Sequence, residues 1–158
     1  MGRERINAVT TSFFGRGSIG LLPGELKKRG YRRGLIVTDR FLFEHKAADR
    51  VGEQILAAGA EYAVFYLVQP NPTIENVREC AAIAREQECT FVVGLGGGSS
   101  IDTAKAAAVM ATNDGDWWDY VYGGSGKGQK IKNQPLPIVA ITTTAGTGTE
   151  ADPWSVIT

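Results

Sequence analysis

Short apolar runs rich in β-branched residues alternate along this chain with longer segments in which apolar residues recur every three or four positions. The short runs predict buried strands, and the helical spacing predicts amphipathic helices. Strands are predicted over residues 8–14, 35–38, 62–68 and 137–141 and from Phe91 onward; helices are predicted before Gly30, over 41–58, after Thr73 and over 101–112. This alternation predicts an α/β fold whose mainly parallel sheet has helices on both faces.

Helix-ending residues mark several boundaries. Pro23 suits the first turn of the first helix, and Gly30 suits the position just after its end. Gly59 closes the second helical stretch, and Thr73 is placed to cap the next helix. Residues 123–134 are rich in glycine and lysine and predict a mobile surface loop.

Composition narrows the class of protein. The 158 residues fit one domain, and 43% hydrophobic with 22% charged residues is typical of a soluble globular protein. Lysine plus arginine equals aspartate plus glutamate at 17 each, so bulk charge favours neither nucleic acid nor an anionic membrane. No run approaches a membrane span of ~20 residues, and the N-terminus lacks the apolar stretch of a signal peptide. We therefore expect a cytoplasmic protein in which Cys80 and Cys89 are buried free thiols.

Residues 91–105 carry the strongest chemical signal. An apolar strand breaks into the glycines 96–98 and restarts as a helix, which points free backbone N–H groups and the positive helix end at one place. Glycines let a diphosphate approach the backbone and adopt any positive φ that the turn needs. Ser99 and Ser100 are predicted to cap the helix, and Asp102 is placed in its first turn, aimed at a ligand hydroxyl or amide.

The common phosphate motifs do not fit this loop. A G-x-G-x-x-G pattern that starts at Gly94 reaches Ser99 instead of its last glycine. A P-loop pattern around residues 126–127 starts at Val121 and ends at Gly128, and so fails at both ends. The loop is therefore a phosphate loop of another lineage, or a plain turn between strand and helix without a ligand.

A second polar turn follows the predicted strand at 137–141. Residues 142–150 combine closely spaced threonine hydroxyls with glycines, which suits ribose, phosphate or carboxamide groups; the alternative is a hydroxyl-rich loop at a strand end. Asp39 also follows a strand, so it becomes a candidate for the ribose hydroxyls, favouring NAD over NADP. Asn71, between two prolines, is either a ligand to adenine or ribose or a turn residue.

Taken together, these motifs resemble a known family. They are Phe-Gly-Arg-Gly at 14–17, Ile-Val-Thr-Asp at 36–39, Pro-Asn-Pro-Thr at 70–73, the glycine-serine motif at 96–105 and the threonine-glycine motif at 143–150. In this order and at these spacings they resemble the N-terminal dinucleotide-binding domain of the iron-containing (group III) alcohol dehydrogenases. The resemblance covers essentially residues 1–158 and implies a Rossmann-like fold of the dehydroquinate synthase-like type.

The resemblance also implies a set of cofactor contacts. The positions that contact NAD(H) in that family match Asp39, Asn71, Gly97, Gly98, Ser99, Asp102, Thr143, Thr144 and Thr147. Two positions depart from the family pattern. Thr142 stands where proline is common, and Asp152 stands where a small hydroxyl residue is common, which brings a carboxylate toward the nicotinamide end.

The family's metal, iron or zinc, is held by one aspartate and three histidines of a helical domain that we expect after residue 158. The single histidine of this chain, His45, is predicted on a surface helix and is no ligand. The chain also ends inside a pattern typical of a strand, at residues 156–158, so we expect it to be a fragment. We assign no catalytic residue to it.

The resemblance implies that the intact protein uses NAD and a divalent metal to oxidise a primary alcohol or diol and to reduce the aldehyde. It also implies a homo-oligomer, a dimer or larger, while this chain alone is expected to be inactive. A stand-alone nucleotide-binding module without catalysis and a glycerol dehydrogenase-like relative are the alternatives. The substrate and the metal are not named by these residues.

Overall fold

The structure is a computed structural model and describes residues 11–158. Its elements, in chain order, are a 3₁₀ helix η1 (Ser18–Leu21), α1 (Leu22–Arg29), β1 (Arg33–Val37), α2 (Arg40–Glu44), α3 (Ala47–Ala57), β2 (Glu61–Phe65), α4 (Ile74–Glu86), β3 (Phe91–Gly96), α5 (Gly98–Thr112), α6 (Trp117–Tyr120) and β4 (Ile138–Thr142). In residues 11–158 no helix is both long enough and apolar enough to cross a membrane.

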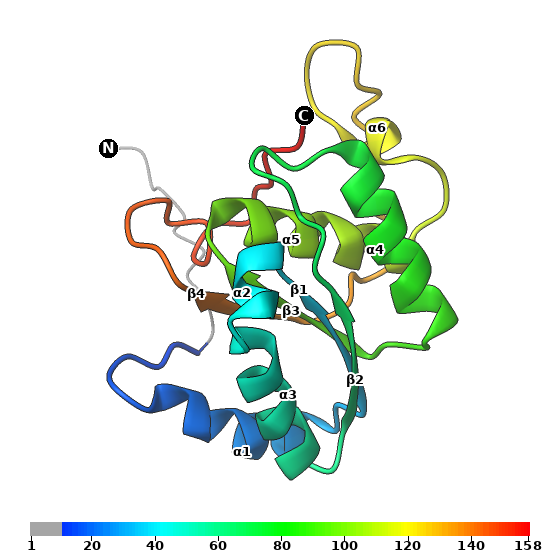
Figure 1. The fold of residues 1–158 in the computed structure, drawn as a ribbon. Helices are drawn as coiled ribbons and strands as arrows, with labels where there is room; N and C mark the ends of the chain where they lie inside the picture. The colour runs from blue at the N-terminus through cyan, green and yellow to red at the C-terminus, as the bar shows by residue number, and fades with distance from the viewer. Residues whose placement is uncertain (1–10) are drawn as a thin grey trace, which may run out of the picture.

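The strands form one parallel sheet in the order β2-β1-β3-β4 (Figure 1). The chain therefore moves outward from β1 to β2, returns across β1 to β3, and continues in the opposite direction to β4. A reversal of this kind, between β1 and β3, leaves a crevice outside the carboxyl ends of the two central strands. The predicted α/β fold with a parallel sheet is confirmed.

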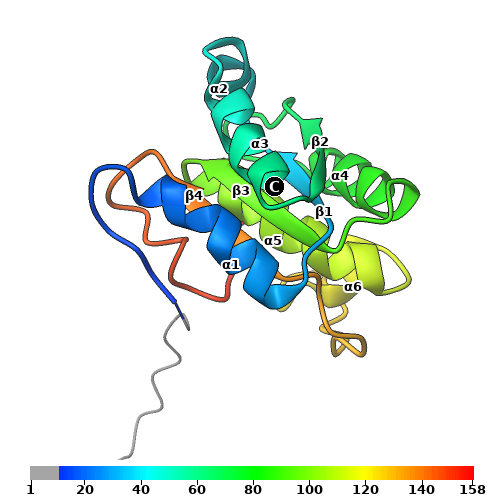
Figure 2. The same cartoon turned by 90° about the horizontal axis from the view of Figure 1, so that it is seen from below.

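Helices cover both faces of the sheet, with α1 and α3 on one side and α4 and α5 on the other (Figures 1 and 2). Alternate residues of the strands point to the two layers, as the strand period requires. In β3, Phe91 and Val93 pack toward α1 and α3, whereas Val92 packs toward α4 and α5. Both layers are apolar, so the central strands are buried on both faces, as parallel sheets require.

Gly94 brings α5 close to β3. A Cβ atom at this position would lie 3.0 Å from the Cα of Ile101 and 3.1 Å from the Cβ of Ala104. Both neighbours belong to the same helix, so a side chain at 94 would have to displace the α5 backbone. The absence of a Cβ at Gly94 thus allows α5, the helix that follows the glycine turn, to pack this close to β3.

Gly94→Ala is expected to lower the free energy of unfolding by about 1–3 kcal/mol, because overpacking forces the backbone to shift. Gly24→Ala is the matched control, because a Cβ there meets nothing within 4 Å and the position is helical. Alanine is the better helix former, so this control should be neutral or slightly stabilising. Urea unfolding of both variants measures the difference, and equal stabilities would show that α5 adjusts without cost.

Several predicted boundaries are confirmed. Pro23 lies at the start of α1, and Gly30, in the left-handed region, ends it. The hydroxyl of Thr73 accepts the Asn76 N–H as the cap of α4. Cys80 is buried and free, as Cys89 is, and burial raises the pKa of both thiols.

Other predicted elements differ from the structure. The helical stretches predicted over 41–58 are α2 and α3, and the sequence did not place the break between them, where Lys46 adopts φ 62°. The predicted strand at 8–14 is not seen at residues 11–14, and its first part lies outside the described residues. The strand predicted at 62–68 ends at Phe65. The chain end near Thr158 is not a strand, although its backbone bonds to Pro72 and Ile74.

Residues 123–134 form neither helix nor strand and are mostly exposed, as predicted for a surface loop, and hydrogen bonds attach this loop to its neighbours. The Gln129 N–H donates to the Asp119 carbonyl at 2.7 Å, and the buried Asn113 side chain accepts the Lys132 N–H at 3.1 Å. The segment is thereby tied to α5 and α6. It lies far from the carboxyl end of β4 in both views (Figures 1 and 2).

Candidate functional site

The candidate site lies at the carboxyl ends of β1, β3 and β4. Asp39 follows β1 and the Gly97 turn follows β3, so they flank the crevice at which the strand order reverses. Residues 143–148 follow β4 and form a loop that we call the threonine loop. This loop is attached to the same turn, because the Thr143 N–H donates to the Gly96 carbonyl at 3.0 Å. Motifs that are far apart in the sequence are thus brought together at one edge of the sheet.

The glycine turn differs from the prediction in its conformation. Gly96 alone of residues 96–98 has a positive φ, at 143°, whereas Gly97 has φ −85° and caps α5. The helix begins at Gly98, before the predicted start at 101, so Ser99 and Ser100 lie inside its first turn and do not cap it. The cap is a glycine without a side chain. The first N–H groups of α5 therefore receive no hydrogen bond from a cap side chain, which leaves them available to an anion.

The threonine loop lies over these glycines. A Cβ atom built on Gly97 would lie 3.0 Å from the Thr144 hydroxyl, and one built on Gly98 would lie 3.3 Å from the Thr147 methyl group. Thr143, Thr144 and Thr147 are otherwise exposed. Their loop and the start of α5 thus form two sides of one polar site.

Asp39 has a structural role besides its predicted one. One carboxylate oxygen, Oδ1, accepts the Leu42 N–H at 2.8 Å and caps α2. The side chain is half-buried beside the crevice. The cap orients the carboxylate. Within residues 11–158 its other oxygen accepts no hydrogen bond, so it can accept one from a ribose hydroxyl.

Asn71 lies at the tip of the loop between β2 and α4. Its φ of 58° is in the left-handed region, which asparagine tolerates better than most residues, and its side chain is exposed. The buried Asn76 holds this loop, because its side chain bonds to the backbone of Gln69 and Leu67. Our reading of the sequence missed Asn76, although a polar residue on the apolar face of α4 was the signal.

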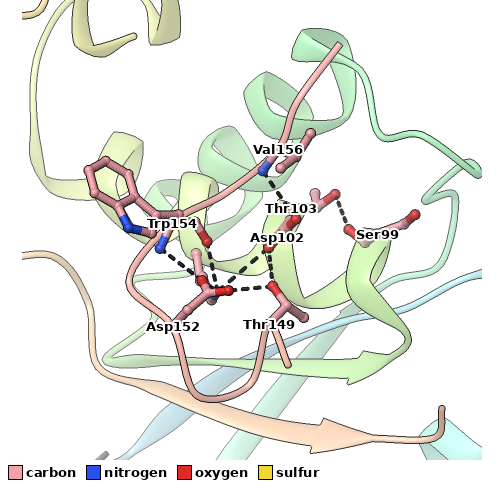
Figure 3. Close-up of polar contacts among 8 residues, drawn as sticks. Ser99, Asp102, Thr103, Thr149, Asp152, Trp154 and Val156 are labelled. Atoms are coloured by element: carbon pink, nitrogen blue, oxygen red, sulfur yellow. Dashed lines mark hydrogen bonds and ion pairs between the residues drawn. The ribbon is translucent and has the colours of Figure 1, made fainter. Parts of the chain in front are cut away.

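Asp102 is buried, and it lies in the second turn of α5 because the helix starts early. Its Oδ1 accepts the Thr149 hydroxyl, and its Oδ2 accepts the Val156 N–H at 3.1 Å (Figure 3). Both oxygens are therefore bonded to the segment that follows the threonine loop. The turn places Asp102 beside the site, and its side chain is directed at residues 149–156.

Two further polar residues that the sequence reading did not single out lie near Asp102. Lys105, one turn along α5, lies 3.6 Å from Asp102 Oδ1, an i, i+3 spacing that was readable from the sequence. Glu150 follows Thr149, and within residues 11–158 its buried Oε2 has no hydrogen-bond partner. Ser99 is half-buried in the first turn, and its carbonyl accepts the Thr103 hydroxyl at 2.8 Å.

The described residues do not offer a metal site. Residues 11–158 contain no group of three or more His, Cys, Asp and Glu side chains arranged to hold a metal ion. His45 is exposed at the end of α2, where its ring stacks on Phe41 at 4.0 Å. The polar groups at the carboxyl edge suit an anionic ligand with hydroxyl and amide groups.

Comparison with known proteins supports this description. Residues 10–158 match the family described as iron-containing alcohol dehydrogenase. The chain is 40% identical to the NAD-dependent methanol dehydrogenase of Bacillus methanolicus over 93% of its own length. It is 38% identical to the lactaldehyde reductase of Escherichia coli over 94% of its length. It spans 37% and 38% of these two relatives.

Solved structures agree in fold. The NADH-dependent butanol dehydrogenase A of Thermotoga maritima superposes with a TM-score of 0.90 at 32% identity, covering 100% of this chain and 39% of that one. The sulfoacetaldehyde reductase of Bifidobacterium kashiwanohense, solved in complex with NAD⁺, gives a TM-score of 0.75 at 36% identity. That match covers 86% of this chain and 35% of the reductase.

Proposed function

We propose a function from the premise that this chain belongs to the iron-containing alcohol dehydrogenase family, a membership that the match over residues 10–158 establishes. The chain is the NAD-binding part of a metal-assisted dehydrogenase that oxidises a primary alcohol or diol and reduces the aldehyde. The observation that carries the proposal is the start of α5, where no side chain caps the helix. It lies beneath the threonine loop and beside the crevice between β1 and β3.

The residues of the site have distinct proposed roles. The N–H groups at Gly97, Gly98 and Ser99 take the diphosphate, because the helix dipole and the absent side chains favour a close anion. Asp39 accepts from the adenosine ribose and disfavours a 2′-phosphate. Asn71 contacts the adenosine end.

The threonine loop is proposed to contact the other half of the cofactor through Thr143, Thr144 and Thr147. The contact between Asp102 and NAD stays a prediction from the sequence. We give Asp102 no role in holding the cofactor, because both of its oxygens already accept hydrogen bonds from within the chain. When it is bound, NAD supplies the hydride acceptor of the reaction. The part played by these residues is to hold the dinucleotide in one orientation.

The metal has no place among residues 11–158, because they lack a ligand set for it. We assign no catalytic residue to this chain. We propose that a further helical domain of the intact protein supplies the metal ligands and that the intact protein is a homo-oligomer. A cytoplasmic location fits the two free buried cysteines.

The substrate class follows from the relatives. The four matched proteins described above are named for methanol, lactaldehyde, butanol and sulfoacetaldehyde, which are small primary alcohols or aldehydes. We propose a substrate of this class for the intact protein.

Titration calorimetry with NAD and ADP-ribose tests the proposal on this 158-residue chain. We expect weak binding of both ligands, because a pocket that surrounds a ligand on fewer sides buries less of it. We expect no alcohol oxidation by this chain alone, with or without added Fe²⁺ or Zn²⁺. Metal-dependent turnover by this chain would contradict the assignment of the metal ligands elsewhere, and absence of binding to the full-length protein would refute the NAD site. Full-length protein that binds NAD but oxidises no alcohol would be a nucleotide-binding module.

A further inference from the structure

Lys105 donates three hydrogen bonds to residues 149–154, and the proposed function gives it no task. Its Nζ lies 3.0 Å from the Thr149 hydroxyl, 3.0 Å from Asp152 Oδ1 and 2.8 Å from the Trp154 carbonyl. Its side chain is only 12% exposed. A lysine that has lost most of its water needs such partners, because an ammonium group offers three donors.

These partners all belong to residues 149–156, the segment that follows the threonine loop (Figure 3). Asp102 adds further bonds to the same segment through Thr149 and Val156. Asp152 also accepts the Trp154 N–H at 2.9 Å, which closes a turn. One lysine and one aspartate on α5 therefore hold a segment that has no helix or strand of its own.

The charges make Lys105 the centre of this cluster. One ammonium group faces two carboxylates, Asp102 at 3.6 Å and Asp152 at 3.0 Å. Without it, the two carboxylates would face each other with no cation between them, and like charges at short range repel. The Asp102 side chain is 11% exposed and has little water to screen it, whereas Asp152 is 45% exposed. Loss of the lysine should therefore push the segment away from α5.

The position of the segment decides the position of the threonine loop. The loop is attached at one end, where Thr143 bonds to Gly96. Only one residue, Gly148, separates Thr147 from the buried Thr149. The anchor at Thr149 therefore limits how far Thr147 can move away from Gly98, because a one-residue link is short even when that residue is a glycine.

We propose that Lys105 is a positioning residue that holds residues 149–156 against α5 and thereby keeps the threonine loop over the glycine turn. Asp152 is its auxiliary partner. The effect on cofactor binding rests on the proposed function, whereas the attachment of the segment does not. Hydrogen exchange tests the attachment of the segment, and calorimetry tests its effect on cofactor binding.

Hydrogen exchange of the full-length protein without ligand tests the attachment. In Lys105→Met, which keeps a long apolar stem, amides of residues 149–158 should exchange about tenfold faster or more, since breaking a buried ion pair is strongly destabilising. The exchange rates of the β1 amides should be the same as in the wild type. Lys105→Arg keeps the charge and should restore part of the protection. An equal increase in β1 would show a general loss of stability and would overturn the proposal, as would unchanged exchange at 149–158.

Calorimetry with NAD on the same proteins tests the consequence. Lys105→Met should weaken NAD binding about tenfold or more, because misplacing a group by about 1 Å can have effects of this size. Asp152→Thr should weaken it only about two- to threefold, since Asp102, Thr149 and Trp154 still bond to the lysine. Asp49→Asn, which removes an exposed ion pair on α3, is the control and should bind as the wild type does.

The two hypotheses fail in different ways. A wild-type protein that does not bind NAD refutes the proposed function, while exchange can still show the attachment of the segment. A wild type that binds NAD together with a Lys105→Met variant that binds equally well refutes the positioning role of Lys105. Should Lys105→Met not fold, Asp152→Thr carries the test, and faster exchange at 149–158 than in β1 is the result expected.

Discussion

Gly98→Val is expected to weaken NAD binding by about 100-fold or more while the domain stays folded. The new Cβ would lie 3.3 Å from the methyl group of Thr147, and the two γ-methyl groups would extend into the space between α5 and the threonine loop. A diphosphate that bonds to the N–H groups at the helix start needs this space. A 100-fold loss corresponds to ~2.7 kcal/mol of binding free energy.

Volume alone is the physical reason for this effect. Neither glycine has the positive φ that the sequence allowed for this turn, because Gly97 has φ −85° and Gly98 is helical. Gly97→Val should act in the same way as Gly98→Val, through volume alone, with its Cβ 3.0 Å from the Thr144 hydroxyl. Gly96 has φ 143°, so a substitution there would add strain of about 1–3 kcal/mol and would confuse binding with folding.

Calorimetry measures the loss of NAD binding, and circular dichroism shows that the variants keep their helices. Gly20→Ala is the control, because a Cβ there meets nothing within 4 Å and its φ is not positive. Gly123 is unsuitable as a control because its φ is 93°. Normal NAD affinity in both the Gly97 and Gly98 variants would remove the glycine turn from the site.

Asp39→Gly is expected to lower NAD affinity about tenfold or more and to raise NADP affinity. The change removes hydrogen bonds from a charged acceptor, which contribute about 1.5–3 kcal/mol each, and it removes the repulsion of a 2′-phosphate. Asp39 also caps α2 through the Leu42 N–H. Glycine is a tolerated cap, so the fold should lose only a few tenths of a kcal/mol.

Asp39→Asn separates the two roles, because asparagine can cap α2 as aspartate does but carries no charge. It should improve NADP binding with α2 intact. Dissociation constants for NAD and NADP, measured on the full-length variants, give the selectivity ratio. A ratio that stays at the wild-type value in both variants would exclude Asp39 from the ribose site.

Much of the fold was predictable because its signals are local. The order strand, glycine turn and helix at residues 91–112 follows from apolar spacing and the glycines, and the cap at Thr73 follows from one side chain and its own helix. The sequence predicted helical stretches over 41–58 but not where they divide, since nothing in the helical spacing marks Lys46 as a residue with positive φ. The early start of α5 was missed because serine is a common cap and here lies inside the helix.

The candidate site also has features that the sequence predicted and features that it did not. The sequence by itself determined which residues lie at strand ends, namely Asp39, the glycine turn and the threonine loop, because each is read from its neighbours in the chain. Only the tertiary structure decided that Asp39 and Gly97 flank one crevice, since this depends on the order of the strands. It also decided that Asp102 bonds to Thr149 and Val156 and that Lys105 bonds to residues 149–154. These contacts join residues more than 40 positions apart, and they form only where α5 packs on β3 and the chain after β4 returns to it, a long-range arrangement that no local pattern encodes.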